Sequence, residues 1–379
     1  MAMLDVLTPN YDDIEVRLLR DYEKNYVAEL SGSSGHVSCK LPPAPLDELA
    51  SEYAPRVYGP KLYTWLFQDD VLAAFQRARW SADGSTHTAP SSGLRLRLWI
   101  DPKLAELHHV WWEAMIDPLR EAPLCLDLAM SRYLRVSQAR GWPIAERPLR
   151  MLTLVASPRG VENFDLPSID LSQETSIIGK ATAGLQPFVQ NEILAEDVTP
   201  ERVMAELSKG YHILHILAHP VRFQDRYCLL LSDADGNAVP VALEKLAQAM
   251  EGSSASPPCF VFLATPMKAD EQVGELLVQA APSLVAAGAQ AVLAIQAAME
   301  VDTLRLFAER LYTALIRTGT VDNAVTVARS AVYYARPDSW EWALPVLYMR
   351  TPDGQLFQPL SEVLEEKVQR LATALQFKA

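Results

Sequence analysis

Short, almost uninterrupted apolar runs alternate with amphipathic stretches over the second half of the chain. The clearest run is Tyr211-His-Ile-Leu-His-Ile-Leu-Ala-His219, which lies between Gly210 and Pro220. A short apolar run bounded by turn residues is typical of a strand buried on both faces of a parallel sheet. A second run of this kind, Cys259-Phe-Val-Phe-Leu-Ala264, follows along the chain. The two runs predict neighbouring strands in one sheet.

The rest of this half predicts an α/β fold with a doubly wound, mostly parallel sheet and helices on both faces. Thr199 followed by Pro200 is a helix start, with a hydroxyl N-cap and proline at the first helical position. The Asp-Gly pair at 235–236 predicts a hairpin turn. Further strands are expected at 149–156, 188–194, 228–231, 238–241 and 344–350, and helices at 243–250, 301–318, 321–335 and 360–376.

The first half has a different pattern and predicts an α+β region with antiparallel strands, packed alongside the sheet. Leu94-Arg-Leu-Arg-Leu-Trp-Ile100 alternates apolar and basic side chains, so we expect one buried and one solvated face. Other strands are expected at 14–20, 26–30, 36–41 and 124–128, and a helix at 60–79. We divide the chain into an N-terminal region (1–147), a core (148–358) and a C-terminal helix (359–379).

Leu276 to Met299 contains no charged residue and has the length of a membrane span. Pro282 and Gly288 divide it, and the predicted structure is a helix, a glycine stop and a strand at 291–295. The formal net charge of −13 disfavours nucleic acid or an anionic membrane as a partner, because phosphate binding needs clustered cations.

Four cysteines, at positions 39, 125, 228 and 259, lie far apart without CxxC spacing, so we expect no disulfide framework and no zinc site. The N-terminal sequence has no apolar signal segment, and we expect a cytoplasmic protein. His212, His215 and His219 alternate along one strand and cannot converge on a metal. We expect no metal and no cofactor.

His219 is the strongest candidate for chemistry, because open α/β sheets place their sites at the carboxyl ends of strands. The neighbouring run ends at Ala264, so the side chain of Thr265 is expected nearby. His215, further inside the strand, is interpreted as a core histidine.

The order and spacing of these motifs resemble the CHAT family of caspase-like cysteine peptidases. Its histidine strand ends in a pattern like HFAGHG and its cysteine strand in one like VVLSACETG. The counterparts here read HILAHP and FVFLATPMK, followed by Ala291-Val-Leu-Ala-Ile-Gln296 and Trp340-Glu-Trp-Ala-Leu-Pro-Val-Leu-Tyr348. The stretch from Leu94 to Glu113 is similar to the LRL…PWE segment that precedes many such domains. The resemblance implies a caspase-like sheet in which His219 and Thr265 occupy the two positions of the catalytic dyad.

Three departures from the family pattern concern catalysis. Thr265 occupies the position of the nucleophilic cysteine, and a hydroxyl in mid-chain is a poor nucleophile. Pro220 replaces a glycine whose N–H resembles an oxyanion donor, and proline has no N–H. Pro266-Met267-Lys268 replaces the usual Glu-Thr-Gly. Cys259 cannot substitute for the nucleophile, because it begins the strand that Thr265 follows.

These losses predict a pseudopeptidase, catalytically inactive and acting as a protein-binding or regulatory module. The resemblance implies a prokaryotic signalling or defence setting, with a protein or peptide partner such as an active relative or an effector. Pro220, Pro266 and Met267 would border the former cleft beside His219 and Thr265. Two alternatives stay open: an active peptidase that pairs His219 with a non-standard nucleophile, and a structural scaffold with a vestigial cleft.

Overall fold

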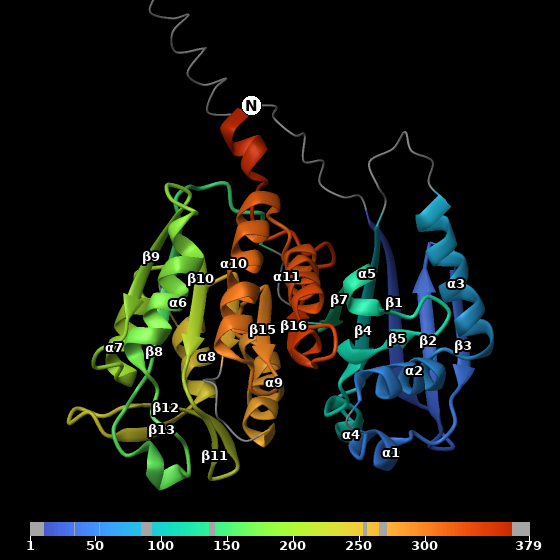
Figure 1. Cartoon of the computed structure of the whole chain (residues 1–379), viewed down its shortest axis with the longest axis horizontal. Coiled ribbons are helices and arrows are strands. Elements are labelled where there is room, and N and C mark those ends of the chain that lie inside the picture. The colour runs from blue at the N-terminus through green and yellow to red at the C-terminus, as the bar shows by residue number, and fades with distance from the viewer. Residues whose placement is uncertain are drawn as a thin grey trace, which may run out of the picture.

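The computed structural model is organised around one large sheet (Figure 1). It describes residues 11–33, 35–52, 54–84, 93–135, 141–252, 256–264 and 271–365. Within these residues the sheet has 11 strands in the order β3-β2-β1-β4-β7-β16-β15-β14-β10-β8-β9. The two halves of the chain therefore contribute the two sides of a single sheet.

The second half forms the mostly parallel part of the sheet, as predicted. β10 pairs in parallel with β14 on one side and with β8 on the other. β9 continues the parallel order beyond β8, and β15 beyond β14, while β16 runs antiparallel to β15. These strands are β8 (Leu149–Val155), β9 (Val189–Leu194), β10 (Ile213–Leu217), β14 (Phe260–Ala264), β15 (Ala291–Ile295) and β16 (Pro345–Met349).

Helices cover both faces of this part, which confirms the doubly wound architecture. Buried residues of one set of helices share a core with one face of the strands: α6 (Leu171–Ala183), α10 (Val301–Thr318) and α11 (Val321–Ala335). A second core lies on the opposite face, beneath α7 (Pro200–Leu207), α8 (Leu243–Glu251) and α9 (Glu271–Ala286). The Thr199 side chain caps α7 by accepting a hydrogen bond from the N–H of Arg202, as its sequence predicts.

The N-terminal strands, which were predicted to include antiparallel ones packed alongside the sheet, join that sheet edge to edge. β1 (Tyr11–Arg20) pairs antiparallel with β2 (Tyr26–Gly32), and β2 with β3 (Gly35–Lys40). β1, β4 (Gly93–Ile100) and β7 (Ala129–Tyr133) are parallel to one another. β7 then meets β16 through only two residue pairs, Arg132 with Tyr348 and Tyr133 with Met349. This short ladder is the seam between the two halves.

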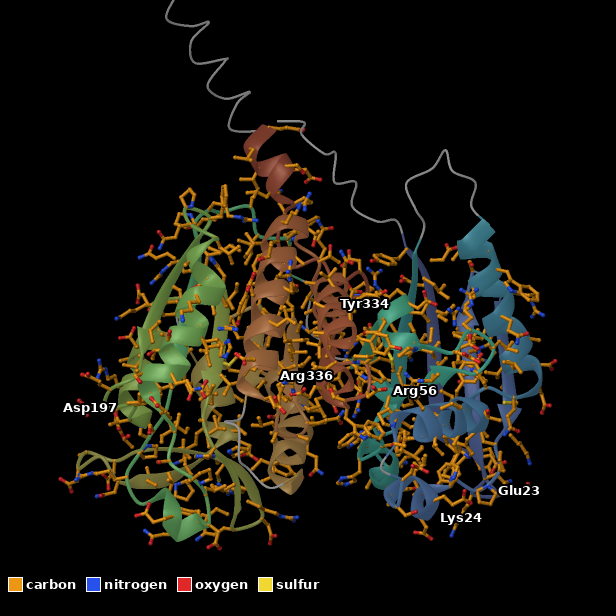
Figure 2. All side chains as sticks on the ribbon, in the orientation of Figure 1. Glu23, Lys24, Arg56, Asp197, Tyr334 and Arg336 are labelled. Carbon is orange, nitrogen blue, oxygen red and sulfur yellow. The ribbon has the colours of Figure 1, made fainter. Side chains whose placement is uncertain are left out.

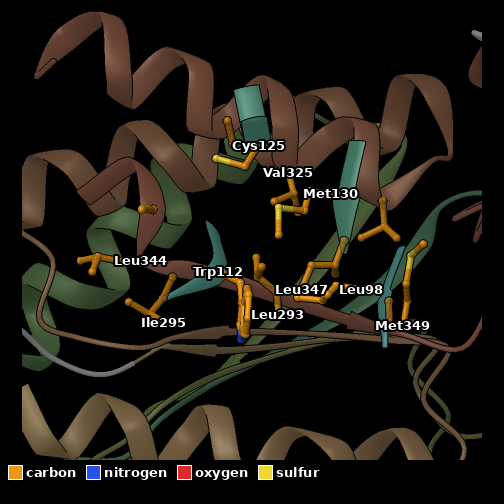
Figure 3. Packing of buried hydrophobic residues seen from close by; sticks show 14 of the residues in the cluster. Leu98, Trp112, Cys125, Met130, Leu293, Ile295, Val325, Leu344, Leu347 and Met349 are labelled. Atoms are coloured by element: carbon orange, nitrogen blue, oxygen red, sulfur yellow. The ribbon is translucent and has the colours of Figure 1, made fainter. Parts of the chain in front are cut away.

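Apolar packing crosses the seam. Figure 3 shows Leu98 and Met130 from the first half beside Leu293, Leu347 and Met349 from the second. All five are buried within one core cluster. Strands from both halves therefore share a core beneath α11.

Several N-terminal elements differ from the sequence prediction for local reasons. The helix expected at 60–79 is two helices, α2 (Pro55–Leu66) and α3 (Asp69–Gly84), because Phe67 leaves the helix and stacks on Phe75 with ring centroids 4.1 Å apart. The strand expected at 124–128 is the short helix α5 (Leu124–Asp127), which follows Pro123. The remaining short elements are α1 (Leu46–Ala50), α4 (Ala105–His108), η1 (Trp112–Ala114), β5 (Ile116–Asp117) and β6 (Ala122–Pro123).

The basic face of β4 is less solvated than predicted. Arg95 is only 4% exposed, and its Nε donates a hydrogen bond to the carboxylate of Asp322, in the first turn of α11. Arg95 also pairs with Asp13 of β1. Burial raises the pKa of Asp322, and the nearby Arg95 guanidinium acts in the opposite direction. This ion pair is a second connection between the two halves.

A three-stranded sheet lies beyond the carboxyl end of β10. It contains β11 (Pro220–Phe223), β12 (Arg226–Ser232) and β13 (Ala238–Ala242), in antiparallel order. The β12–β13 hairpin around Asp233 and Gly236 was predicted, whereas β11 was not. The short helix η2 (Val161–Phe164) follows β8, and η3 (Glu341–Ala343) precedes β16.

The predicted C-terminal helix begins at Leu360 and is described to Glu365. Val363 is buried and Leu364 is 42% exposed; Val368, Leu371 and Leu375 lie outside the described residues. The uncharged segment 276–299 forms the end of α9 and strand β15, as predicted. Among the described helices, none has the length and apolarity needed to cross a bilayer.

Candidate functional site

The candidate site lies where three parallel strands end together. Leu217 of β10 pairs with Val155 of β8 and with Ala264 of β14, so the three chain segments leave the sheet at one edge. His219 lies two residues after the last residue of β10. The residues expected to face it, Thr265, Pro266 and Met267, lie outside the described residues, which end at Ala264 and resume at Glu271. The described part of the site is therefore its histidine side.

His219 is fully buried and has a defined orientation. Its Nε2 lies 2.7 Å from the carbonyl oxygen of Pro167, in the segment that connects η2 with α6. A carbonyl oxygen only accepts, so Nε2 carries the ring proton and Nδ1 holds the lone pair. Nδ1 is buried and has no partner among the described residues. In this tautomer Nδ1 is the ring nitrogen that can accept a proton from a neighbouring group.

The environment of His219 keeps the ring neutral. Burial lowers its pKa below the ordinary value, and the hydrogen bond to Pro167 offsets part of that effect. A neutral ring retains its lone pair at Nδ1, because burial disfavours the protonated, charged form. His219 is thus a buried, neutral imidazole with a free lone pair, which is the protonation state of a general base.

Pro220 removes a donor next to this histidine. It opens β11, where it pairs with Leu229, and the His219 carbonyl accepts a hydrogen bond from Leu230 N–H at 2.9 Å. Proline is tolerated at the first residue of a strand because it needs no ladder donor there. The peptide nitrogen that follows His219 can therefore not stabilise a developing oxyanion.

The other two histidines of the run have separate environments. His215 is fully buried, and its Nδ1 lies 2.6 Å from the Tyr312 hydroxyl of α10. His212 accepts a hydrogen bond at Nδ1 from the backbone N–H of Arg150. Across the parts of the chain that the structure describes, no three His, Cys, Asp or Glu side chains are grouped so as to hold a metal ion.

None of the four cysteines has the environment of a nucleophile. All four are buried and free of disulfides. Burial raises the pKa of Cys125 and of Cys259 to about 12 and also raises the pKa of Cys39 and Cys228. Each is a protonated thiol at neutral pH, whereas the thiolate is the reactive form.

Two structurally important partners were not found from the sequence. Pro167 is far from His219 in the chain, and nothing in its neighbourhood predicts that its carbonyl would fix the ring. Glu113, in the stretch similar to the family's PWE segment, forms a buried ion pair with Arg132 of β7. The family motif includes Glu113, but only the structure shows that Arg132 is its partner.

A family model described as the CHAT domain matches residues 56–350, which is most of the chain. No curated protein matches the sequence. The structure is similar to that of the Arg-specific cysteine proteinase gingipain R, with 11% identity, a TM-score of 0.46 and coverage of 79% of this chain and 70% of that one.

A complex of the pro- and mature domains of RgpB from Porphyromonas gingivalis gives 11% identity, a TM-score of 0.47 and coverage of 77% and 70%. A separase–securin complex of Saccharomyces cerevisiae gives 9% identity and a TM-score of 0.45; the match covers 90% of this chain but 30% of the separase chain. At such identity the likeness is one of fold and does not extend to activity. The family match is the decisive finding, and the protein belongs to the CHAT domain family.

Proposed function

We propose that this protein is a catalytically inactive CHAT-family member, a pseudopeptidase that acts by binding another protein. The observation that carries the proposal is the chain geometry at His219 and Pro220. The residue after the histidine is a proline that begins a strand, so the oxyanion donor expected at that point is absent. Loss of one such donor typically lowers the rate about 10²–10³-fold.

The nucleophile is the second missing part. Threonine stands where the family has its cysteine, and a mid-chain threonine hydroxyl is not a ready nucleophile. The four cysteines of the chain are buried with raised pKa values, so none of them supplies a thiolate in its place. Loss of the nucleophile prevents attack on the peptide carbonyl, and loss of the N–H donor removes stabilisation of the oxyanion that this attack would form. Both losses therefore impair peptide hydrolysis.

One observation favours the rival, an active peptidase. The bond from His219 Nε2 to Pro167 leaves Nδ1 unprotonated, which is the form that a general base requires. A base without a nucleophile and without an oxyanion donor has no acyl-transfer reaction to assist. The retained orientation is therefore interpreted as a structural remnant, and peptide hydrolysis by the wild type compared with His219→Ala separates the two possibilities.

We expect that Thr265→Cys alone will not hydrolyse peptides, whereas Thr265→Cys/Pro220→Gly will show measurable hydrolysis. The first change supplies a thiol beside His219, and the second restores a backbone N–H next to it. The rate ratio between the two variants should reach about 10². Hydrolysis of fluorogenic arginine, lysine and aspartate peptides measures it, with His219→Ala added to the double variant as the control. Equal rates for the single and double variants would contradict the assigned role of Pro220.

The binding role is the remaining part of the proposal. The former substrate cleft, bordered by His219, Pro220, Thr265, Pro266 and Met267, would hold an extended peptide without cutting it. An active relative or another effector in a prokaryotic signalling or defence system is the partner that this reading favours. A scaffold with a vestigial cleft is the outcome if Thr265→Arg alters no interaction in a pull-down from native lysate.

A further inference from the structure

A cavity of about 440 Å³ lies at the seam between the two halves, and His219 is not among its lining residues. The first half contributes the start of α2 and the β5–β6 hairpin, and the second half contributes the end of α11 and the turn that follows it. Its volume is within the range of sites that hold ligands, and such sites occur preferentially between domains. Its lining residues are Pro55, Arg56, Pro60, Ile116, Pro118, Glu121, Pro123, Tyr333, Pro337 and Trp342.

The seam cavity has a mixed lining, with buried apolar side chains below and the charged Arg56 and Glu121 among its lining residues. Ile116, Pro123 and Trp342 are buried at its floor, and Trp342 is held edge-on to Tyr333 with ring centroids 5.8 Å apart. Half of the ten lining residues are prolines, whose fixed φ reduces the cost of ordering the walls when a ligand binds. Prolines also offer no N–H groups, so these wall positions present carbonyl acceptors but no backbone donors.

The rim of the cavity has two charged side chains, Arg56 and Glu121. Arg56 lies 3.3 Å from the carboxylate of Asp338, and both side chains are exposed. Glu121 is exposed, and no cation of the described chain lies within ion-pair distance of it. The rim therefore attracts a cation to Glu121, in a protein whose formal net charge is already −13.

Exposed apolar side chains extend the surface beyond the cavity. Leu119 is 77% exposed beside Pro118, and Tyr334 is 84% exposed beside Tyr333. Figure 2 shows Tyr334 and Arg56 on the two sides of the seam. Large apolar side chains at this exposure, next to a preformed cavity, are typical of a surface that binds another chain.

We propose that the seam cavity binds an extended, proline- or leucine-containing peptide segment with a basic residue beside its apolar anchor. The apolar side chain would occupy the floor formed by Ile116 and Trp342, and the basic residue would pair with Glu121. Proline-rich segments dock into grooves lined by aromatic side chains because their extended conformation costs little entropy.

This site is independent of the histidine site, and its occupancy does not depend on whether His219 is catalytic. The test uses the full chain and two fluorescein-labelled twelve-residue peptides, built from proline, leucine and arginine or from proline, leucine and glutamate. Fluorescence polarisation is expected to show at least tenfold tighter binding of the arginine peptide. Glu121→Lys is expected to abolish or reverse this preference, and Tyr333→Ala to weaken binding of both peptides.

The matched control is Glu251→Lys, at the exposed end of α8, which changes the net charge by the same amount. It is expected to leave the tenfold preference intact, because the charge lies away from the seam. No binding of either peptide at 1 mM (~4 kcal/mol), equal affinity for the two, or the same loss of preference in both lysine variants would overturn the proposal. None of these readouts involves hydrolysis, so their failure is distinguishable from that of the inactive-peptidase proposal.

Discussion

Replacing Glu113 by alanine is expected to lower the free energy of unfolding by about 3–5 kcal/mol. Glu113 is 1% exposed and accepts two hydrogen bonds from the guanidinium of Arg132, at 3.1 and 2.7 Å. Arg132 is 2% exposed and also donates to the carbonyls of His108 and Val110. Burial disfavours its charge, but the Glu113 carboxylate raises the pKa of Arg132 above its ordinary value. Without Glu113 the cation remains buried with no counter-charge.

The Glu113–Arg132 pair lies at the seam, so the change in the free energy of unfolding also tests whether this pair holds the two halves together. Arg132 lies in one of the two residue pairs that join β7 to β16, and it reaches the hydroxyl of Tyr348 across them. Chemical denaturation followed by circular dichroism measures the change. The double variant Glu113→Leu/Arg132→Met should lose much less free energy of unfolding than Glu113→Ala, because no charge is left unpaired.

The control for this prediction is Arg56→Ala, which breaks the exposed pair with Asp338. Exposed ion pairs contribute little to the free energy of unfolding. The denaturation midpoint of Arg56→Ala should therefore stay close to that of the wild type. A Glu113→Ala midpoint no lower than that of Arg56→Ala would show that the buried pair does not hold the seam.

Acidification below neutral pH is expected to destabilise the protein, with His215 as a principal cause. His215 is fully buried between Phe262 and Tyr312, and burial lowers its pKa to about 3 from an ordinary value of 6.5. Between these two pH values the unfolded chain binds a proton at this histidine that the folded chain does not. The contribution of neutral His215 to the free energy of unfolding is complete above pH 6.5. It is lost as the pH falls, by at most about 1.4 kcal/mol per pH unit.

Three other histidines act in the same direction, because burial also lowers the pKa of His108, His212 and His219. His215→Gln removes the largest single contribution and keeps a polar partner for the Tyr312 hydroxyl. Between pH 7 and pH 5 the variant should lose about 2 kcal/mol less stability than the wild type. Unfolding curves at several pH values measure the difference.

The matched control is His36→Gln, since His36 is exposed on the edge strand β3. It should leave the pH dependence of stability as in the wild type. If His215→Gln and the wild type lose stability in parallel on acidification, His215 is protonated in the folded state and its interpretation as a neutral core residue is wrong.

The sequence predicted the part of the fold in which local pattern and burial agree. Strands β10 and β14 are short apolar runs between turn residues, and each is buried along its whole length. The cap at Thr199 and the stop at Gly288 both follow from local chemistry. In these stretches tertiary contacts reinforce the local preference, so a pattern is sufficient.

Elsewhere, distant contacts decide the structure. Phe67 leaves its helix to stack on Phe75, and Arg95 is buried because Asp322 receives it from the other half of the chain. β11 begins with proline and turns through Gln224 and Asp225 at positive φ, so its sequence has no clear strand pattern. The merging of both halves into one sheet depends on two residue pairs between β7 and β16, which no local pattern reveals.

The candidate site shows the same division. The position of His219 at the end of β10 follows from periodicity, and the absence of an N–H at Pro220 follows from its identity. Its burial and the Pro167 carbonyl that selects its tautomer follow only from the fold. The seam cavity was not predicted at all, because its ten lining residues come from separate segments of both halves.

The most direct test of the inactive-peptidase account is the hydrolysis of reporter peptides by the wild-type protein. Fluorogenic arginine, lysine and aspartate peptides are incubated with the purified full chain and, in parallel, with His219→Ala. The account predicts background release from every peptide, identical for the two proteins and unchanged by thiol alkylation. Turnover by the wild type that disappears in His219→Ala would contradict it and establish an active enzyme with a non-standard nucleophile.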